Sequence, residues 1–361
     1  MNPTLVSILP SHPNEGWVSM NRYWEAVDRG SREYSGTEFQ LRCPLKFAGI
    51  CSPQTGKLRL AWQKKIVYPL KTRFTATSGV AHILDHSYAF LLKYLPRNVR
   101  TIVTVHDLLP LREPDGLSNQ AIARFRERVE WVKKADQILS DSEATSRDLV
   151  ELIGADVRKI RVLPLGSDPA SQGQGDENLS FGSGGFIFSI GGYMKRKNLG
   201  ILPEILAEVR RKHPGVKLVR AGARIPASLA ADFESKCGAD SLVELGQVSE
   251  SILAALYRNA NATIIPSRYE GFGLPVLEAM ARGCPVVSAD TTSLPEVGGD
   301  VPLYFDVDNP GEAADQLNRI LEASPSWLAD LKQRGEARAA EFTWDIHFST
   351  LLDIYREVAA R

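Results

Sequence analysis

The stretch from residue 262 to residue 288 constrains the fold of this chain more than any other. It begins with an apolar run that predicts a buried strand, and it continues through a loop that contains Gly271 and Gly273. Pro275 suits the first turn of a helix, where its missing N–H costs nothing, and Gly283 suits the end of that helix, before a second apolar run. This order of strand, glycine loop, helix and strand indicates an open α/β sheet, which binds ligands at such loops.

Two carboxylates indicate what this loop binds. Glu270 lies on the loop, and we expect Glu278 in the first turn of the helix, on the inward side with Leu274 and Ala281. A carboxylate on that side needs hydrogen bonds, which ribose hydroxyls would supply, or it only complements the helix dipole. The backbone N–H groups at the helix start can hold a hexose or a phosphate, and they belong to Gly271, Phe272, Gly273 and Leu274.

The motif Glu-Gly-Phe-Gly-Leu-Pro-Val-Leu-Glu-Ala-Met-Ala, from Glu270 to Ala281, resembles the signature of retaining glycosyltransferases of family 4. The resemblance extends from about Val99 to the C-terminus. It implies an α/β fold of the GT-B type, in which two Rossmann-like domains enclose a deep interdomain cleft. It also implies a C-terminal helix that crosses back onto the N-terminal domain.

The length of the chain supports two domains, because 361 residues exceed one ordinary core. We expect an N-terminal acceptor-binding domain at residues 1–170, a nucleotide-sugar-binding domain at 184–341 and the crossing helix at 342–361. The chain has no apolar run of 18 residues, and its start lacks a signal-peptide pattern. Its four cysteines have no zinc spacing, so we expect reduced, mostly buried thiols in a cytoplasmic protein.

A basic stretch in the N-terminal part stands out although the net charge is zero. The first hundred residues hold 14 Lys and Arg against 6 Asp and Glu, and no acid lies between Glu38 and Asp85. Aromatic residues are interleaved with the bases of residues 42–73. The stretch predicts peripheral attachment to an anionic surface at the inner face of the membrane, or binding to an anionic acceptor. The alternative is a solvated basic surface over core aromatics.

Residues 101–108 form a β-branched run that predicts a buried parallel strand, and the run includes His106 and Asp107 near its carboxyl end. The family resemblance places such a histidine beside the donor sugar, and Asp107 would orient it or meet the acceptor. Family members have a glycine loop after the first strand, near the donor phosphates and the acceptor, where this chain offers Gly16. We interpret His82 and His86 as structural residues.

The apolar run at residues 186–190 predicts the first strand of the second domain. Two glycines follow it, and then three bases before Asn198, which we expect to cap the next helix. Glycines and bases at a helix start predict an anion site. The resemblance implies a phosphate-binding role for Lys197. Many family members carry an arginine where this chain has Gly192 in the donor-binding loop, and we expect Arg196 to supply that charge instead. The resemblance also places the backbone of Gln247 and Val248 beside the nucleotide base.

The sequence therefore predicts a retaining glycosyltransferase that moves a hexose, of the mannose type, from a nucleotide-sugar to a glycan or lipid-diphosphate acceptor in polysaccharide biosynthesis. Catalysis would depend on His106, Glu270, Lys197 and Arg196, with Glu278 on the ribose. The donor is a GDP-, UDP- or ADP-hexose. We expect no obligatory cofactor or metal, because Lys and Arg replace a metal as the counter-charge of the diphosphate, and no nucleic-acid partner. The alternatives are a nucleotide-sugar epimerase of the same fold and a non-catalytic sugar-binding protein.

Overall fold

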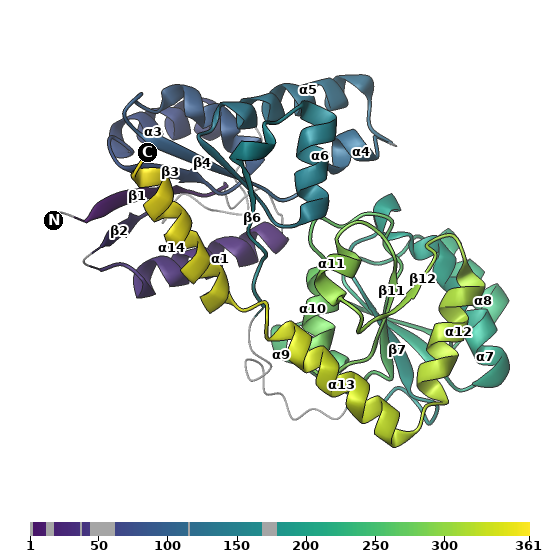
Figure 1. The fold of residues 1–361 in the computed structure, drawn as a ribbon. Helices are drawn as coiled ribbons and strands as arrows, with labels where there is room; N and C mark the ends of the chain where they lie inside the picture. Colours follow the sequence, from purple (N-terminus) through teal and green to yellow (C-terminus); the bar gives the residue numbers. More distant parts are fainter. Residues whose placement is uncertain (1–2, 12–17, 37, 44–61, 115, 168–178) are drawn as a thin grey trace. The chain divides into compact units, whose positions relative to one another are not determined.

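A computed structural model describes residues 3–11, 18–36, 38–43, 62–114, 116–167 and 179–361. The chain forms two compact units (Figure 1). The first comprises residues 1–164 and the C-terminal residues 347–361, and the second comprises residues 165–346. The last helix, α14 (Trp344–Ala359), therefore joins the first unit from His347 onward.

The first unit is built on a six-stranded sheet of order β2-β1-β3-β4-β5-β6, in which every pairing is parallel. Its strands are β1 (Thr4–Leu9), β2 (Phe39–Arg42), β3 (Val80–Ile83), β4 (Arg100–Val105), β5 (Gln137–Ser140) and β6 (Ile160–Val162). Its helices and short helical turns, besides α14, are α1 (Val18–Glu33), η2 (Gln63–Val67), α3 (Tyr68–Thr75), η3 (His86–Tyr94), α4 (Leu109–Arg112), α5 (Asn119–Val129), η4 (Glu130–Lys134), α6 (Glu143–Ile153) and η5 (Val157–Lys159).

The second unit repeats this plan with a parallel sheet of order β12-β11-β10-β7-β8-β9. Its strands are β7 (Phe186–Ile190), β8 (Lys217–Ala221), β9 (Leu242–Gly246), β10 (Ala262–Ile265), β11 (Val286–Ala289) and β12 (Leu303–Phe305). Its helices and turns are η6 (Lys195–Lys197), η7 (Leu199–Ile201), α7 (Leu202–Lys212), α8 (Ala227–Cys237), α9 (Glu250–Asn259), α10 (Leu274–Met280), α11 (Leu294–Gly298), α12 (Pro310–Leu321) and α13 (Pro325–Ala339).

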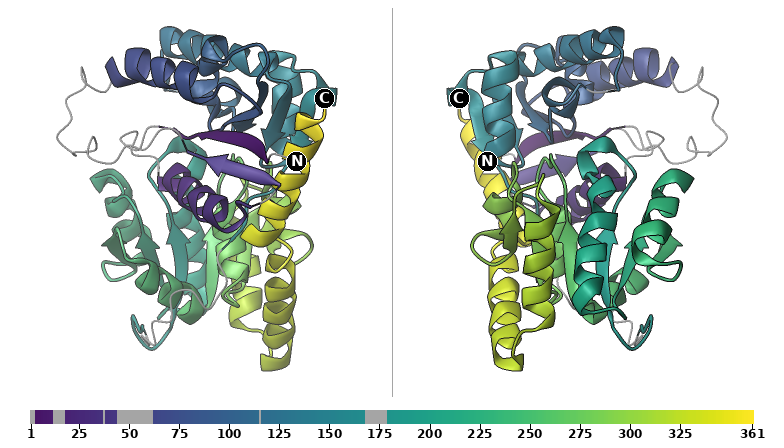
Figure 2. Two further views of the ribbon diagram at one scale, coloured as in Figure 1. Left: turned by 90° about the vertical axis from the view of Figure 1, so that its left-hand side faces the viewer. Right: turned by 90° about the vertical axis from the view of Figure 1, so that its right-hand side faces the viewer.

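Helices cover both faces of each sheet, which is why the central strands are almost continuously apolar. In the first unit α1 and α14 lie on one face, and α3 and α5 lie on the other (Figures 1 and 2). In the second unit α7, α8 and α12 lie on one face, and α9, α10 and α13 on the other. Buried strands such as Val80–Ile83 and Ala262–Ile265 expose no residue on either face.

Several local predictions are confirmed. Ser142 and Ser249 accept a hydrogen bond from the backbone N–H three residues later and so cap α6 and α9. Pro275 lies in the first turn of α10. Gly283 has a φ of +64°, a left-handed conformation that suits glycine at the end of the turn after α10.

Two local predictions are wrong. Asn198 does not cap a helix, because its own backbone is left-handed and its side chain donates to the carbonyl of Val307. The three bases before it form the separate turn η6, and α7 begins only at Leu202. Glu278 lies in the second turn of α10 rather than the first, because that helix begins at Leu274.

Candidate functional site

The loops after β7 and β10 meet at the point where the strand order of the second sheet reverses. Strands β8 and β9 extend the sheet from β7 to one side, and β11 and β12 extend it from β10 to the other. Because all six strands are parallel, their carboxyl ends lie at one edge, and sheets of this kind bind ligands where the strand order reverses. The sequence motifs at Gly191–Lys197 and at Ser267–Leu274 follow these two strands.

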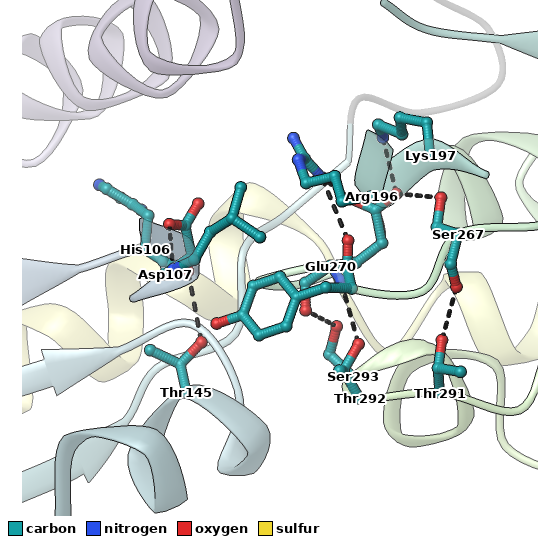
Figure 3. Close-up of polar contacts among 12 residues, drawn as sticks. His106, Asp107, Thr145, Arg196, Lys197, Ser267, Glu270, Thr291, Thr292 and Ser293 are labelled. Atoms are coloured by element: carbon teal, nitrogen blue, oxygen red, sulfur yellow. Dashed lines mark hydrogen bonds and ion pairs between the residues drawn. The ribbon is translucent and has the colours of Figure 1, made fainter. Parts of the chain in front are cut away.

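Glu270 is the centre of this edge and contacts both predicted cations (Figure 3). Arg196 donates from Nη1 to Oε2 of Glu270 at 2.8 Å, and Lys197 donates from Nζ to Oε1 at 2.6 Å. Ser267 donates a third hydrogen bond to Oε1, at 2.7 Å. The structure thus brings together three of the four residues predicted to be catalytic, from loops more than seventy positions apart in sequence.

The cluster formed by Arg196, Lys197 and Glu270 carries one more positive than negative charge. Burial would raise the pKa of Glu270, but the charges of Lys197 and Arg196 and the hydrogen bonds from Lys197 and Ser267 outweigh it and hold the pKa below its usual value. Glu270 is therefore ionised near neutral pH, and the two cations share one carboxylate. A buried arrangement with an unbalanced cation attracts an anion.

The backbone of the glycine loop is fixed by hydroxyl groups from the segment between β11 and α11. Glu270 donates its N–H to Oγ1 of Thr292, and its carbonyl accepts from Ser293. Thr291 donates to the carbonyl of Ser267 at 2.7 Å. These three consecutive hydroxyl residues hold Glu270 in place, and sequence inspection missed them because they lie on a different strand connection.

Arg220 is a second residue that sequence inspection missed. It lies on β8, its side chain is 2 % exposed, and it donates from Nη2 to the carbonyl of Gly191 at 3.2 Å. Its Nη1 lies 3.6 Å from Oε1 of Glu244. A trans peptide points its carbonyl and its N–H in opposite directions, so a carbonyl held by Arg220 turns the N–H of Gly192 away from Arg220.

The remaining predicted donor residues lie on the same edge of the second sheet. Glu278 accepts a hydrogen bond from the hydroxyl of Tyr257 on one carboxylate oxygen, at 3.1 Å. Gln247 and Val248 follow β9, with Gln247 exposed. The other predicted residues lie in the loops after β7 and β10, and they are Gly192, Gly271, Phe272, Gly273 and Leu274.

Phe272 contributes its backbone rather than its ring to any binding at this loop. The side chain is buried and packs edge-on against Phe342, with ring centroids 5.9 Å apart. Gly273 has a φ of +106°, and a Cβ there would lie 3.0 Å from Leu294. The second glycine of the motif is therefore required by its backbone conformation.

His106 forms a separate centre at the carboxyl end of the first sheet, directly after β4. Its Nδ1 lies 2.6 Å from Oδ2 of Asp141, and its Nε2 lies 2.8 Å from the carbonyl oxygen of Leu84. Both partners are acceptors, so both ring nitrogens must donate, which requires the charged imidazolium. Asp141 was not predicted from the sequence.

The pKa of His106 agrees with this geometry. Burial alone would lower that pKa, but the charge and hydrogen bond of Asp141, with smaller contributions from Asp85 and the carbonyl of Leu84, raise it to about 9. The edge of the Tyr23 ring packs against the imidazole at a centroid distance of 5.0 Å. His106 is therefore a fixed, charged donor pair rather than a mobile base.

Asp107 does not orient His106, because Asp141 does. The carboxylate of Asp107 accepts the backbone N–H of Leu109 at 3.1 Å and so stabilises the turn after the strand. His82 is fully buried between Tyr355 and Thr104, each 2.7 Å from a ring nitrogen, which agrees with a structural role. Gly16 lies outside the described residues.

The part of the chain that the structure describes contains no group of three or more His, Cys, Asp or Glu side chains placed to hold a metal ion. Within the same part, Cys43, Cys237 and Cys284 form no disulfide. No described helix has the length and apolarity needed to cross a bilayer.

Known structures identify the class of fold. Sucrose-phosphate synthase from Thermosynechococcus elongatus matches with a TM-score of 0.73 at 18% identity, covering 99% of both chains. The α,α-trehalose 6-phosphate synthase from Burkholderia multivorans matches with a TM-score of 0.71 at 13% identity, covering 100% of this chain and 98% of that one. These likenesses, with the two parallel sheets, establish the GT-B fold expected from the sequence.

Two family models identify the family. The model described as Glycosyltransferase Family 4 matches residues 53–171, and the one described as Glycosyl transferases group 1 matches residues 175–338. The chain belongs to the family-4, group 1 glycosyltransferases.

Curated relatives agree with this assignment. A D-inositol 3-phosphate glycosyltransferase from Acidothermus cellulolyticus is 30% identical over 63% of this chain and 55% of its own length. The O-antigen chain mannosyltransferase B of Escherichia coli is 29% identical over 73% of this chain and 72% of its own length. The chain thus spans only about half the length of the first of these relatives.

Proposed function

We propose that this chain transfers a hexosyl group from a nucleoside-diphosphate sugar to a glycan or lipid-linked acceptor, with retention of the anomeric configuration. One observation carries the proposal. Two cations, Arg196 and Lys197, share one carboxylate at the switch point of the second sheet. The diphosphate of a sugar donor is an anion that such a cluster attracts.

The residues around this cluster take separate roles. Lys197 and Arg196 bind the diphosphate, and Glu270 is drawn from them to the hydroxyl groups of the hexose when the donor enters. Glu278 binds the ribose. The backbone at Gln247 and Val248 flanks the base, and the backbone N–H groups of Gly192 and of residues 271–274 complete the donor site.

The reaction requires little covalent help from the protein. The bond between the anomeric carbon and the diphosphate oxygen breaks, and both bonding electrons leave with the diphosphate. The acceptor oxygen forms the new bond from the face that the diphosphate leaves, and its proton passes to a diphosphate oxygen. Lys197 and Arg196 stabilise the negative charge that grows on the leaving group, which is the largest contribution we assign to the protein.

The first unit, residues 1–164 and 347–361, binds the acceptor in this proposal. In this proposal the charged imidazole of His106, held by Asp141, helps to position the hexose, and Asp107 lies next to it at the same sheet edge. Two relatives are named as mannosyltransferases, which supports a mannose-type hexose and a place in polysaccharide synthesis. Attachment to an anionic membrane surface through residues 42–73 also belongs to the proposal.

The decisive experiment is a thermal-shift screen against GDP, UDP, ADP and the corresponding sugars. A ligand present at about 100 times its Kd adds roughly 2.7 kcal/mol to the stability of the folded state. We expect one nucleoside diphosphate family to raise the unfolding midpoint and the others to leave it unchanged. No shift with any of them would contradict a nucleotide-sugar donor site.

Product analysis separates the proposed transferase from the alternatives. With the selected donor and an acceptor mixture, a transferase releases nucleoside diphosphate and forms a new α- or β-linked product with the donor's own anomeric configuration. An epimerase would return an isomerised sugar without an acceptor, and a sugar-binding protein would leave the donor intact. The named relatives favour the transferase.

A further inference from the structure

The helical segment formed by η2 and α3 presents two different faces. One face is buried against the core of the first unit through Tyr68, Thr72 and Ala76. The Tyr68 ring packs against Tyr88 with centroids 5.3 Å apart. This face fixes the segment to the sheet, so the orientation of the opposite face is determined by the fold.

The opposite face carries an exposed apolar stripe. Trp62 is 55% exposed, Ile66 45%, Leu70 50% and Phe74 73%. The four residues are spaced by four positions, so they follow one another along one side of the helical segment. At about 1.5 Å per residue the stripe is roughly 18 Å long. The other exposed large apolar residues of the described chain are scattered, and they are Leu117, Val150, Val157, Tyr193, Met194 and Ile346.

Three exposed bases lie on the same segment. Lys65, Lys71 and Arg73 are exposed, whereas Lys64 is partly buried and lies 5.7 Å from the centre of the Tyr88 ring. The chain has no acid from residue 39 to residue 84. The surface around the stripe therefore combines large apolar side chains with uncompensated positive charge.

We propose that the apolar stripe, with Lys65, Lys71 and Arg73, is a docking surface that lies in the interface of an anionic lipid bilayer. A helix of this kind buries its apolar side among the acyl chains near the headgroups, and its bases reach the lipid phosphates. The charge complementarity selects an anionic bilayer over a neutral one. The biological purpose of this docking rests on the proposed function, because a lipid-linked acceptor lies in the membrane surface. The binding to lipid itself needs no sugar donor.

The test is co-sedimentation of the full chain with vesicles, without nucleotide. We expect binding to phosphatidylcholine vesicles that contain phosphatidylglycerol and at least a tenfold weaker partition onto phosphatidylcholine alone. One base near an anionic surface is worth about fivefold in partition, so Lys65→Glu/Lys71→Glu/Arg73→Glu should weaken binding by at least about 100-fold. Salt at about 1 M, where the screening length is about 3 Å, should remove the preference for anionic lipid.

The stripe is tested with Leu70→Ser/Phe74→Ser. Both side chains are exposed, so the variant keeps the core intact, and we expect a loss of roughly tenfold or more in partition with the salt dependence retained. Matched controls keep wild-type partition. They are Val150→Ser/Val157→Ser for the apolar change and Arg32→Glu/Arg147→Glu/Arg158→Glu for the charge change, all of them exposed residues of the first unit.

A site-specific signal comes from Trp62. The fluorescence difference between wild type and Trp62→Phe should shift to shorter wavelength when anionic vesicles are added, because the indole enters an apolar medium. Wild type that ignores anionic vesicles, or stripe and control variants that bind equally, would overturn the proposal and indicate a protein partner or a solvated face. Failure of the nucleotide screen with intact vesicle binding would overturn the proposed function alone.

Discussion

The two sheet edges each hold a cation beside a buried carboxylate, but they are balanced differently. In the first unit His106 pairs with Asp141, and both of its ring nitrogens are already engaged. In the second unit Glu270 is shared by Arg196 and Lys197, which leaves one positive charge in excess. In the first centre both hydrogen-bonding positions of the imidazolium are occupied, whereas the second centre has an excess cation that can receive an anion.

This difference indicates that the cluster in the second unit is better suited to bind an anionic ligand than the His106–Asp141 pair in the first unit. A saturated ion pair gains little from a further polar partner, so His106 would act on a substrate through its charge and fixed position rather than through a new hydrogen bond from a ring nitrogen. An ionised Glu270 keeps two cations close together without substrate, and an incoming diphosphate can replace it as their partner. The comparison therefore predicts larger catalytic losses in the second unit than in the first.

The largest effect should come from Glu270. We expect Glu270→Ala to lower transfer about 1,000-fold or more, a scale seen when a preorganised electrostatic group is removed. Nucleoside diphosphate binding should remain measurable. Glu270→Gln should even bind the diphosphate more tightly, because the cations lose their internal counter-charge. Steady-state kinetics and calorimetry check this, and wild-type turnover in Glu270→Ala would remove Glu270 from the mechanism.

The second effect concerns Lys197. Because Lys197 neutralises the leaving diphosphate, Lys197→Ala should raise the barrier by roughly 2–4 kcal/mol and weaken donor binding. Lys195→Ala is the matched control, since Lys195 is an exposed base in the same turn. Equal kinetics for both variants would place the phosphate site elsewhere.

A smaller effect, on stability, is expected in the first unit. The pKa of folded His106 is about 9, above its ordinary 6.5, so its contribution is complete below about pH 6.5 and disappears as the pH rises through 9. The shift corresponds to at most about 3 kcal/mol. In Asp141→Asn the pKa of His106 should fall, so the unfolding midpoint should decline less from pH 6.5 to 9 than in wild type.

His82 and His347 give the stability profile a separate acid limb. Burial lowers their pKa values to about 3 and about 4, so their contributions are lost as the pH falls below 6.5. Because the charge of Asp141 also raises the pKa of His347, this acid limb changes in Asp141→Asn, and only the range above pH 6.5 tests His106. Parallel profiles of the two proteins above pH 6.5 would contradict the assignment of Asp141 as the partner that charges His106.

The smallest expected effect is that of metal removal. Arg196 and Lys197 supply the counter-charge for the diphosphate in this account, so EDTA should leave transfer within about twofold of its untreated rate. The measurement is initial-rate kinetics before and after EDTA. Complete loss that magnesium or manganese restores would show that the two cations do not suffice.

Local patterns in the sequence predicted much of the fold. The apolar run at residues 186–190 marks β7 with its observed bounds, because a buried parallel strand is almost continuously apolar. The capping serines 142 and 249 act within three residues of themselves, so their role is visible in the sequence. The predicted helix cap at Asn198 is wrong because tertiary contacts hold that residue in a left-handed conformation.

The partners of the site residues could not be predicted in the same way. Asp141 meets His106 only because β5 pairs with β4, and Arg220 meets Gly191 only because β8 pairs with β7. Helix α3, at the end of the basic stretch, likewise places Tyr68 in the core and Phe74 at the surface. Composition does not separate these two aromatics, since the helical register decides which one is buried.

The central claim is that Lys197 and Arg196 bind the diphosphate of the donor. The most direct measurement compares, by calorimetry, the nucleoside diphosphate selected by the thermal-shift screen with its parent nucleoside. We predict that Lys197→Ala raises the Kd of the diphosphate about tenfold or more and leaves the Kd of the nucleoside unchanged. An equal change for both ligands, or no change for the diphosphate, would contradict the claim.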